Sequence, residues 1–386
     1  MAKLKVLHVT KHYPPYVGGI ETVCKDLCIA LKDDYEQKVL CFNNEKETVN
    51  EKYEGIDVVR VGVTVTIASQ PLSFQYKKEL YKVMKEFKPD IIHFDYPNPL
   101  SSHYLLKAIK KFKFQGKFQL FWHMDIIKQK FIEPFFRREI LKLIKISDQI
   151  IITTPNYLEN TSYLPKYADK DKVVVLPLRV GEERLVINEE QKILKEKIRK
   201  ENEGKTIGFF FGRHVPYKGI EYLIEANKYL DQDKFTIYIG GKGPLTDSLK
   251  DASKDMKNVK FIGRLSNDEI NAYLLATDLF LFPSITRNEA FGISLAEGLW
   301  FAKPAVTFTI PGSGVNWVSI KDETGLEVSN RDSKAYAEAM NRLATDKDLY
   351  NKLSKGAYDR AHQYFSSENF NKTTLKCYKE IEKKWN

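Results

Sequence analysis

The chain has 386 residues, 43% of them hydrophobic, and a formal net charge of +10. This length and apolar content are enough for two domains of ordinary size, each with its own core. No apolar run reaches the roughly 18 residues that span a bilayer, and the first residues lead into a strand pattern without a signal-peptide segment, so we expect an unprocessed cytoplasmic protein.

The four cysteines are spread through the chain, at Cys24, Cys28, Cys41 and Cys377. They have neither the CxxC pattern nor the spacing of a metal finger. We therefore expect free thiols with a structural role, and no metal site.

Short β-rich runs alternate with amphipathic helical runs over the first half of the chain. Strands are predicted at residues 5–9, 38–42, 58–61, 90–94, 118–122, 149–153 and 173–176. Apolar residues recur at helical spacing between them, as at Ile20, Val23, Leu27 and Leu31. This alternation predicts a parallel sheet whose strands are joined by right-handed crossovers through helices.

Residues 11–21 follow the first predicted strand and open the first helix. Gly18 and Gly19 would let the backbone approach a ligand closely, and the helix start behind them favours an anion. The segment lacks the GxGxxG of a nicotinamide site, which argues against a dehydrogenase. A tight turn between strand and helix is the alternative explanation for the two glycines.

Residues 107–145 carry a surplus of cations interleaved with aromatic and aliphatic side chains. The cations are Lys107, Lys110, Lys111, Lys113, Lys117, Lys128, Lys130, Arg137, Arg138, Lys142 and Lys145, opposed by Asp125, Glu133 and Glu139. This composition suits an anionic membrane surface, at about 1 kcal/mol per cation. It suits a solvated helix face beside core residues equally well. Nucleic acid ranks behind both, because no recognised binding module for it is present.

Within this segment, the sequence Trp122-His123-Met124-Asp125 ends a predicted strand. A histidine at the carboxyl end of a parallel strand, next to an aspartate, is either a core histidine or a site residue. The sequence alone favours neither reading of His123.

The pattern changes after Pro177. Residues 182–204 are dense in charge and are predicted as a solvated helix and linker. A second series follows, with strands at 206–211, 235–239, 259–261, 279–282 and 305–308 and a long helical region over 330–384. We predict an α/β protein of two doubly wound parallel-sheet halves with a hinge near residue 180. Ligands bind beyond the carboxyl ends of such strands, and two facing halves would form a deep cleft.

Residues 211–219 form a loop after the first strand of the second half. Arg213 and Lys218 stand five residues apart between glycines and could converge on one diphosphate, the first as a planar fork and the second as a point charge. An exposed basic loop is the alternative.

Residues 283–298 contain the strongest pattern, with Glu289 and Glu297 on either side of Gly292. As one helix, this stretch would separate the two carboxylates by about 12 Å along the axis, beyond the roughly 5 to 10 Å of a glycosidase pair. We instead predict Glu289 on a loop and Glu297 a turn into a helix, with free N–H groups near Gly292 available to a phosphate. Each carboxylate could accept bonds from paired sugar hydroxyls.

Together these motifs resemble the retaining glycosyltransferases of family 4, which have the GT-B fold of two Rossmann-like domains. The matching segments are Gly18-Gly19, Gly212-Arg213 with Lys218-Gly219, Glu289 through Glu297, and Gly312 with Glu323-Thr324-Gly325-Leu326. The resemblance implies an acceptor-binding domain over residues 1–180, a nucleotide-sugar-binding domain over 181–361, and a C-terminal helix over 362–386 that packs back on the first domain.

The resemblance also implies roles for individual residues. Arg213 and Lys218 would stabilise the leaving diphosphate, Glu289 and His123 would face the donor sugar, and Glu297 would hold the ribose. The implied donor-binding set is Gly18, Gly19, Arg213, Lys218, Gly241, Arg264, Glu289, Ala290, Phe291, Gly292, Ile293 and Glu297. No nucleophile is implied, so retention would follow from attack on the face that the diphosphate leaves.

No metal and no other cofactor is implied, because the family lacks the Asp-x-Asp metal ligands of the other main transferase fold. Asp231-Gln232-Asp233 has that spacing but is predicted to be a surface turn.

A finer resemblance, carried by residues 122–130 and 154–158, is to bacterial surface-polysaccharide transferases. Many of these transfer mannose or rhamnose to polyprenyl-diphosphate-linked glycans at the inner face of the cytoplasmic membrane. It implies a hexose donor, a lipid-linked acceptor and peripheral contact with an anionic membrane. The alternatives are a nucleotide-sugar or glycan-binding protein without activity, a nucleotide-sugar epimerase, and a phosphorylase, for which no cofactor lysine is identifiable.

Overall fold

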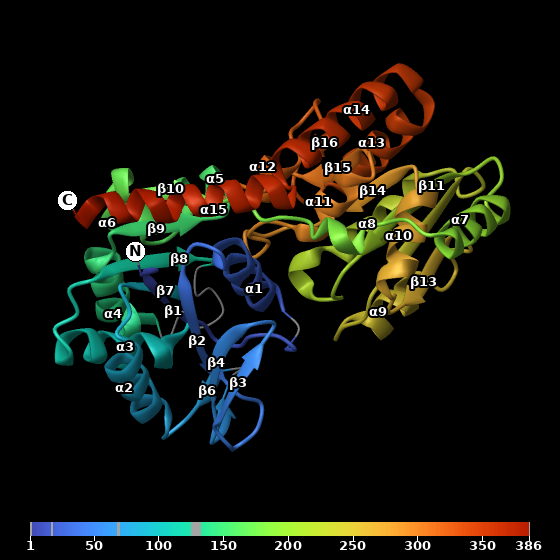
Figure 1. The fold of residues 1–386 in the computed structure, drawn as a ribbon. Helices are drawn as coiled ribbons and strands as arrows, with labels where there is room; N and C mark the ends of the chain where they lie inside the picture. Colours follow the sequence, from blue (N-terminus) through green and yellow to red (C-terminus); the bar gives the residue numbers. More distant parts are fainter. Residues whose placement is uncertain (1, 17, 68–69, 125–132, 386) are drawn as a thin grey trace. The chain divides into compact units, whose positions relative to one another are not determined.

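The computed structural model describes residues 2–16, 18–67, 70–124 and 133–385. The chain folds into two compact units, shown as a ribbon in Figure 1. Unit 1 consists of Met1–Leu176 and Phe370–Asn386, and unit 2 of Pro177–Asn369. Unit 2 thus begins slightly before, and ends slightly after, the predicted domain limits of 181 and 361. None of the described helices combines the length and apolar character needed to cross a membrane.

The sheet of unit 1 has the strand order β10-β9-β8-β7-β1-β2-β4-β3. Neighbouring strands are parallel except β3, which runs antiparallel to β4. The strands are β1 (Lys5–Val9), β2 (Glu36–Phe42), β3 (Val49–Tyr53), β4 (Ile56–Val61), β7 (Ile91–Tyr96), β8 (Lys117–Trp122), β9 (Gln149–Ile152) and β10 (Val173–Val175). A separate small ribbon pairs β5 (Val65–Ile67) with β6 (Gln70–Leu72).

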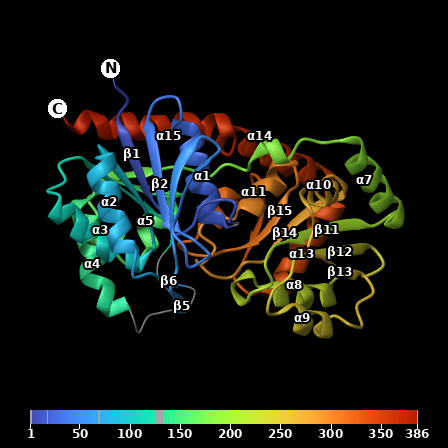
Figure 2. The same ribbon diagram turned by 60° about the horizontal axis from the view of Figure 1, so that its bottom comes forward.

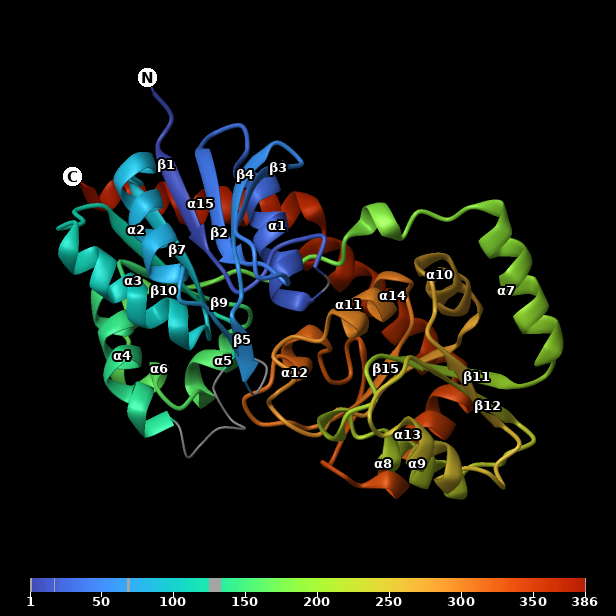
Figure 3. The same cartoon turned by 90° about the horizontal axis from the view of Figure 1, so that it is seen from below.

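Helices cover both faces of this sheet, as Figures 2 and 3 show. The helices α2 (Tyr76–Phe87), α3 (Pro99–Lys111) and α4 (Glu133–Ile146) lie in a row, each against the next. The other helices are α1 (Gly19–Leu31), α5 (Pro155–Asn160), α6 (Leu164–Tyr167) and α15 (Ser367–Glu382). Tyr378 and Ile381 of α15 pack with Val6, Leu31 and Ile91, so this helix completes the core between α1 and the sheet.

Unit 2 has a second, fully parallel sheet with the order β13-β12-β11-β14-β15-β16. Its strands are β11 (Thr206–Phe211), β12 (Phe235–Gly240), β13 (Val259–Gly263), β14 (Leu279–Phe282), β15 (Ala305–Phe308) and β16 (Gly325–Val328). The helices are α7 (Glu189–Glu201), α8 (Ile220–Ala226), α9 (Thr246–Ala252), α10 (Asn267–Ala276), α11 (Ile293–Trp300), α12 (Val315–Val318), α13 (Ser333–Thr345) and α14 (Lys347–Tyr364).

The predicted two-sheet α/β architecture is therefore confirmed. Each predicted strand is present, with ends shifted by two residues at most. These strands are apolar because helices cover them on both faces, and all six residues of β7 and of β12 are buried. The four cysteines are free and buried, as expected.

The carboxyl ends of the central strands place the candidate residues. In unit 1, Asp95 lies near the end of β7 and His123 directly follows β8. In unit 2, the loops that follow β11, β12 and β14 carry Gly212, Gly241 and Ser284. Because the strands that carry them run parallel within each sheet, these residues gather at one edge of their own sheet.

Candidate active site

A buried ion pair joins two loops at the carboxyl edge of the unit 2 sheet. Lys218 ends a short 3₁₀ turn after β11, and its Nζ contacts Oε2 of Glu289 on the loop after β14. The hydroxyl of Ser284 donates a hydrogen bond to the same oxygen at 3.1 Å. Lys218 and Glu289 are 8% and 9% exposed, so solvent and salt screen their attraction little.

A glycine allows these two loops to touch. Gly219 has a φ of +61°, and a Cβ at this position would lie 2.2 Å from the carbonyl oxygen of Pro283. Beside it, the N–H of Ile285 donates to the carbonyl of Tyr217 at 3.0 Å. The close approach of the two backbones is what carries Lys218 to Glu289.

Arg213 lies in the same loop as Lys218 but is exposed. Its charge and that of Glu289 both act on Tyr217, whose pKa is raised to about 12 by burial and by Glu289 while Arg213 opposes the rise. The backbone of the preceding Gly212 packs directly against that of Gly241. Gly241 has a φ of +110°, and a Cβ there would lie 1.9 Å from the Gly212 carbonyl oxygen. Arg264 follows β13 and is exposed.

The helix α11 begins directly after this loop, as predicted. Gly292 precedes its first residue with a φ of +90°, and a Cβ there would lie 3.1 Å from the Phe282 ring. Ile293 and Ser294 form the half-exposed first turn, so the positive end of the helix dipole is at the surface of the unit. Ala290 and Phe291 bridge Glu289 to this start.

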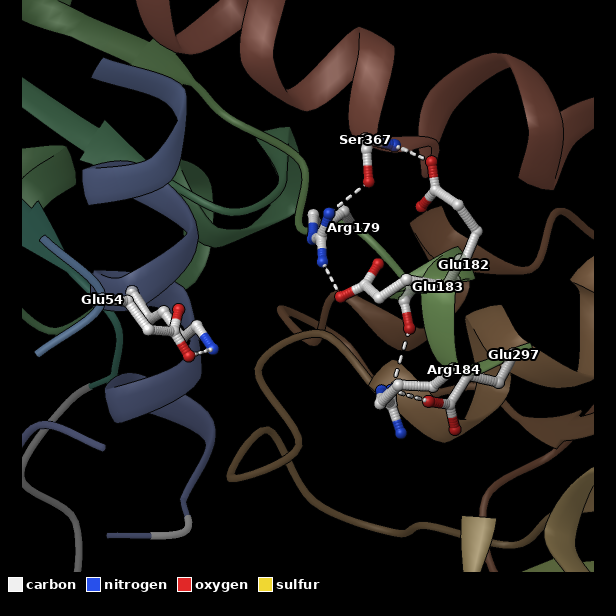
Figure 4. A network of polar contacts seen from close by, with 9 residues as sticks. Glu54, Arg179, Glu182, Glu183, Arg184, Glu297 and Ser367 are labelled. Carbon is white, nitrogen blue, oxygen red and sulfur yellow. Dashed lines mark hydrogen bonds and ion pairs between the residues drawn. The ribbon is translucent and has the colours of Figure 1, made fainter. Parts of the chain in front are cut away.

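Glu297 lies one turn into α11 and is buried, but its partner was not predicted. Arg184 donates from Nη2 to Oε1 of Glu297 at 2.5 Å and to the Val180 carbonyl at 2.9 Å (Figure 4). Burial raises the pKa of Glu297, although the Arg184 charge opposes the rise.

The segment that carries Arg184 is itself anchored in unit 2. Glu182 accepts a bond from the backbone N–H of Ser367 at 2.7 Å, and Arg179 contacts Glu183 and the Ser367 hydroxyl (Figure 4). The charge-rich stretch predicted as linker therefore holds a residue of the candidate site as well as α7.

In unit 1, His123 belongs to a buried cluster on the sheet. Its Nε2 lies 2.7 Å from Oδ1 of Asp95, its ring stacks on Phe121 at 4.0 Å, and it is 5% exposed. His93 Nε2 lies 3.3 Å from the same oxygen. Burial by itself would raise the pKa of Asp95, but the hydrogen bonds from His123 and His93 hold that pKa well below its usual range.

The start of α1 adds a further acid to unit 1. Gly18 has an extended backbone, and a Cβ there would meet the Glu21 carboxylate at 2.1 Å, whereas a Cβ at Gly19 would have nothing within 4 Å. Burial raises the pKa of Glu21, and the charge of Asp95 adds to that rise. Room at Gly19 fits the close approach predicted there.

The structure thus brings some predicted residues together and leaves others apart. Lys218 and Glu289 are in direct contact, while Glu297 instead contacts Arg184. His123, Gly18 and Gly19 belong to unit 1. Asp125, which the sequence places beside His123, lies outside the described residues. Asp231 pairs with Lys234 and accepts from the Asp233 N–H, so the Asp-x-Asp spacing forms the predicted surface turn before β12.

Asp95, Arg184 and Ser284 were missed. Only Asp95 had a signal, since it is an acidic residue at the end of a predicted parallel strand. Among the described residues, His8, Cys24 and Cys28 also form a buried group whose donor atoms lie within 4.8 Å of one another, although their sequence spacing predicts no metal site.

Comparison with known proteins matches both units to glycosyltransferase families. Residues 17–180 match the model of Glycosyltransferase Family 4, and residues 191–360 match that of glycosyl transferases group 1. The O-antigen chain mannosyltransferase C of Escherichia coli is 28% identical over 95% of each chain. The D-rhamnosyltransferase WbpZ of Pseudomonas aeruginosa is 28% identical over 94% of this chain and 93% of its own.

Solved structures share the fold over almost the entire chain. Sucrose-phosphate synthase from Thermosynechococcus elongatus superposes with a TM-score of 0.78 at 16% identity, over 98% of this chain and 99% of its own. Anabaena HepE in complex with UDP and glucose superposes with a TM-score of 0.74 at 16% identity, over 97% and 98%. At these identities the likeness shows the GT-B architecture.

Proposed function

Because this chain belongs to the glycosyltransferases, with a Family 4 domain followed by a group 1 domain, we propose that it transfers a hexose from a nucleotide-diphosphate sugar to a lipid-linked glycan. We further propose that the anomeric configuration is retained and that no metal is needed. Two of the relatives that match almost end to end are named for mannose and rhamnose transfer, the first of them to an O-antigen chain, which supports a role in surface-polysaccharide synthesis.

The observation that carries this proposal is the buried Lys218–Glu289 pair beside the start of α11. A cation, a carboxylate and free helix N–H groups on neighbouring loops provide one partner for each part of a sugar diphosphate. Lys218 and the exposed Arg213 would bind the diphosphate, and Glu289 would accept bonds from the sugar hydroxyls. Fixed positive charges aimed at the leaving group stabilise the negative charge that develops on it during transfer.

Glu297 would accept bonds from the two ribose hydroxyls. In the structure Arg184 already occupies Oε1, so the ribose would share this carboxylate with Arg184. This predicts that Arg184 contributes to nucleotide affinity by orienting Glu297.

The proposed transfer needs no reactant other than the nucleotide-sugar donor and the acceptor. The bond between the anomeric carbon and the diphosphate oxygen breaks while the acceptor oxygen bonds to the same face of that carbon. The acceptor proton passes to the departing diphosphate, which leaves as the nucleoside diphosphate. His123 of unit 1 would contact the donor sugar, and Lys218 and Arg213 would stabilise the negative charge on the leaving group.

The basic segment supports the membrane part of the proposal. On α3 and α4, which lie side by side, Lys107, Lys110, Arg138 and Lys142 are exposed. Of the opposing acids, the described Glu139 is bound by His103 at 2.6 Å. Flotation with anionic liposomes at low and high salt tests this contact. Binding should occur at low salt and weaken as salt rises, and no binding at either would refute it.

A panel of nucleotide sugars, with a lipid-linked oligosaccharide acceptor, tests the main proposal. Release of nucleoside diphosphate together with an elongated acceptor is expected, and it should persist in EDTA. Isomerised sugar without elongation would instead indicate an epimerase. Lys218→Ala and Glu289→Gln should each lower transfer by at least about 100-fold.

The matched control is Lys334→Ala, which removes an exposed lysine of α13 that pairs only loosely with Glu338 at 4.0 Å. It should transfer like the unmodified protein. If Lys218→Ala were as active as this control, the assignment of Lys218 to the diphosphate would be wrong.

A further inference from the structure

A chain of buried polar side chains runs across the unit 1 sheet from His123 to α15. After the His123–Asp95 and Asp95–His93 contacts, His93 Nδ1 lies 2.6 Å from Oε1 of Gln119. Gln119 Nε2 lies 2.7 Å from Oε1 of Gln149, and Gln149 Nε2 lies 3.2 Å from the Cys377 carbonyl oxygen on α15. Each of these polar side chains is at most 5% exposed.

The hydrogen bond from Gln149 to the Cys377 carbonyl determines which group donates in each of the other hydrogen bonds. The Cys377 carbonyl can only accept, so the amide group of Gln149 donates to it and its Oε1 is left to accept from Gln119. Gln119 therefore presents its own Oε1 to His93, which requires a hydrogen on Nδ1 of that ring. Tyr378 Oη, 3.2 Å from the same nitrogen, is a second acceptor there.

The same reasoning assigns the donors and acceptors of the hydrogen bonds between Asp95 and the two histidines. An ionised carboxylate accepts only, so both His93 Nε2 and His123 Nε2 donate to Oδ1 of Asp95. With a hydrogen on each ring nitrogen, His93 is the positive partner of this carboxylate. The other oxygen, Oδ2, is buried and has no hydrogen-bond partner among the described residues. Because a buried carboxylate needs compensation, these two histidines are strongly held to it.

We propose that Asp95 is a positioning residue of the transferase. It holds His123 with the proton on Nε2, and the chain from the Cys377 carbonyl through Gln149, Gln119 and His93 holds Asp95 in place. With Nε2 engaged, Nδ1 is the ring nitrogen of His123 left for the donor sugar. This inference rests on the proposed function, because His123 matters for transfer only if the chain is a glycosyltransferase acting through that residue.

Several other ionisable groups surround Asp95. The charge of Asp95 acts on His8 of β1, on Glu21 and Cys24 of α1, and on Tyr378 of α15. A pH profile of transfer therefore reports on the whole group, so the test below relies on rates, affinities and the position of the His123 proton.

The test compares Asp95→Asn with Gln149→Leu in the full-length protein. Asp95→Asn keeps the shape but removes the charge, and should lower kcat by about 100-fold or more while the affinity for nucleoside diphosphate stays unchanged. Gln149→Leu breaks the outermost link and should lower kcat by about 3- to 10-fold with the donor KM unchanged. Lys379→Ala, on the exposed face of α15, is the control and should have no effect.

The proton position is measured separately by nitrogen-15 NMR of labelled histidines, with the His123 signals assigned from His123→Gln. The unmodified protein should show the Nε2–H form, and Asp95→Asn should show a mixture. Finding the Nδ1–H form in the unmodified protein would overturn the proposal whether or not the variant folds.

The kinetic measurements distinguish failure of the proposed glycosyltransferase function from failure of the positioning role of Asp95. If the unmodified protein transfers no sugar, the proposed function fails. If it transfers sugar and Asp95→Asn is equally active, the positioning role alone fails. Loss of nucleotide affinity in parallel with kcat would show general damage and would also overturn that role.

Discussion

Replacing Gly219 with alanine should disturb the candidate site through backbone geometry alone. With φ at +61°, any Cβ is strained by about 1–2 kcal/mol. The added Cβ would also lie 2.2 Å from the Pro283 carbonyl oxygen, more than 1 Å inside the ordinary contact range, and that oxygen belongs to backbone. Overpacking of this kind typically adds about 1–3 kcal/mol, so we expect a total loss of about 2–5 kcal/mol.

The collision also predicts a loss of activity. Relief requires the Lys218 turn or the Pro283 loop to move by about 1 Å, which separates Lys218 from Glu289. A displacement of that size at a reacting centre can lower the rate by about 100-fold. Urea unfolding and a coupled assay of nucleoside diphosphate release measure the two effects.

Gly204→Ala is the matched control, since Gly204 has a φ of +76° and nothing within 4 Å of an added Cβ. It should lose only the strain term, about 1–2 kcal/mol, and keep full activity. If Gly219→Ala matched Gly204→Ala in both assays, the argument from close approach would be refuted.

Three further predictions concern stability. Arg184→Ala should destabilise unit 2 by about 1–3 kcal/mol in urea unfolding, because it leaves the Glu297 carboxylate buried without its partner while Arg184 itself is 40% exposed. Ile381→Ala should cost about 2–5 kcal/mol, since Ile381 is fully buried between unit 1 helices and sheet. Burial, aided by the Lys11 charge, lowers the pKa of His12 to about 4. Because the folded protein resists protonation of this ring, its contribution to the free energy of unfolding is fully present above pH 6.5. As the pH falls to 4, about 3 kcal/mol of that free energy should be lost, and His12→Gln should remove this pH dependence.

A control variant or measurement can contradict each of these three stability predictions. Adding Glu297→Gln to Arg184→Ala should restore part of the lost stability, and no recovery would mean that charge burial is not the cause. Lys379→Ala on the exposed side of α15 should be neutral where Ile381→Ala is not. For His12, equal pH dependence of unfolding in both proteins between pH 4 and 6.5 would contradict the assignment.

The sequence predicted those parts of the fold whose pattern is local. Strands such as β7 and β12 are short apolar runs because both of their faces are covered, and that signal is strong. The edge strand β3 was missed because four of its five residues are exposed and its middle three are polar, so no apolar pattern marks it.

The candidate site was predictable where a motif is contiguous. Lys218 and Glu289 were found through the segments around them, and their contact follows from neighbouring parallel strands. Arg184 was missed because its partner Glu297 is 113 residues away and nothing local distinguishes it from other charges in the segment. The orientation of His123 likewise depends on Asp95, whose burial only the folded sheet reveals.

The position of α15 has a consequence for biosynthesis. Residues up to Leu176 leave the ribosome before the whole of unit 2, yet Tyr378 and Ile381, which close the apolar layer over Val6 and Ile91, arrive last. At about 5–20 residues per second, the nascent first unit waits for roughly 10 to 40 seconds with that layer uncovered. Chaperone capture should therefore peak while unit 2 is being translated, and a circular permutant that begins with α15 should shorten that exposure.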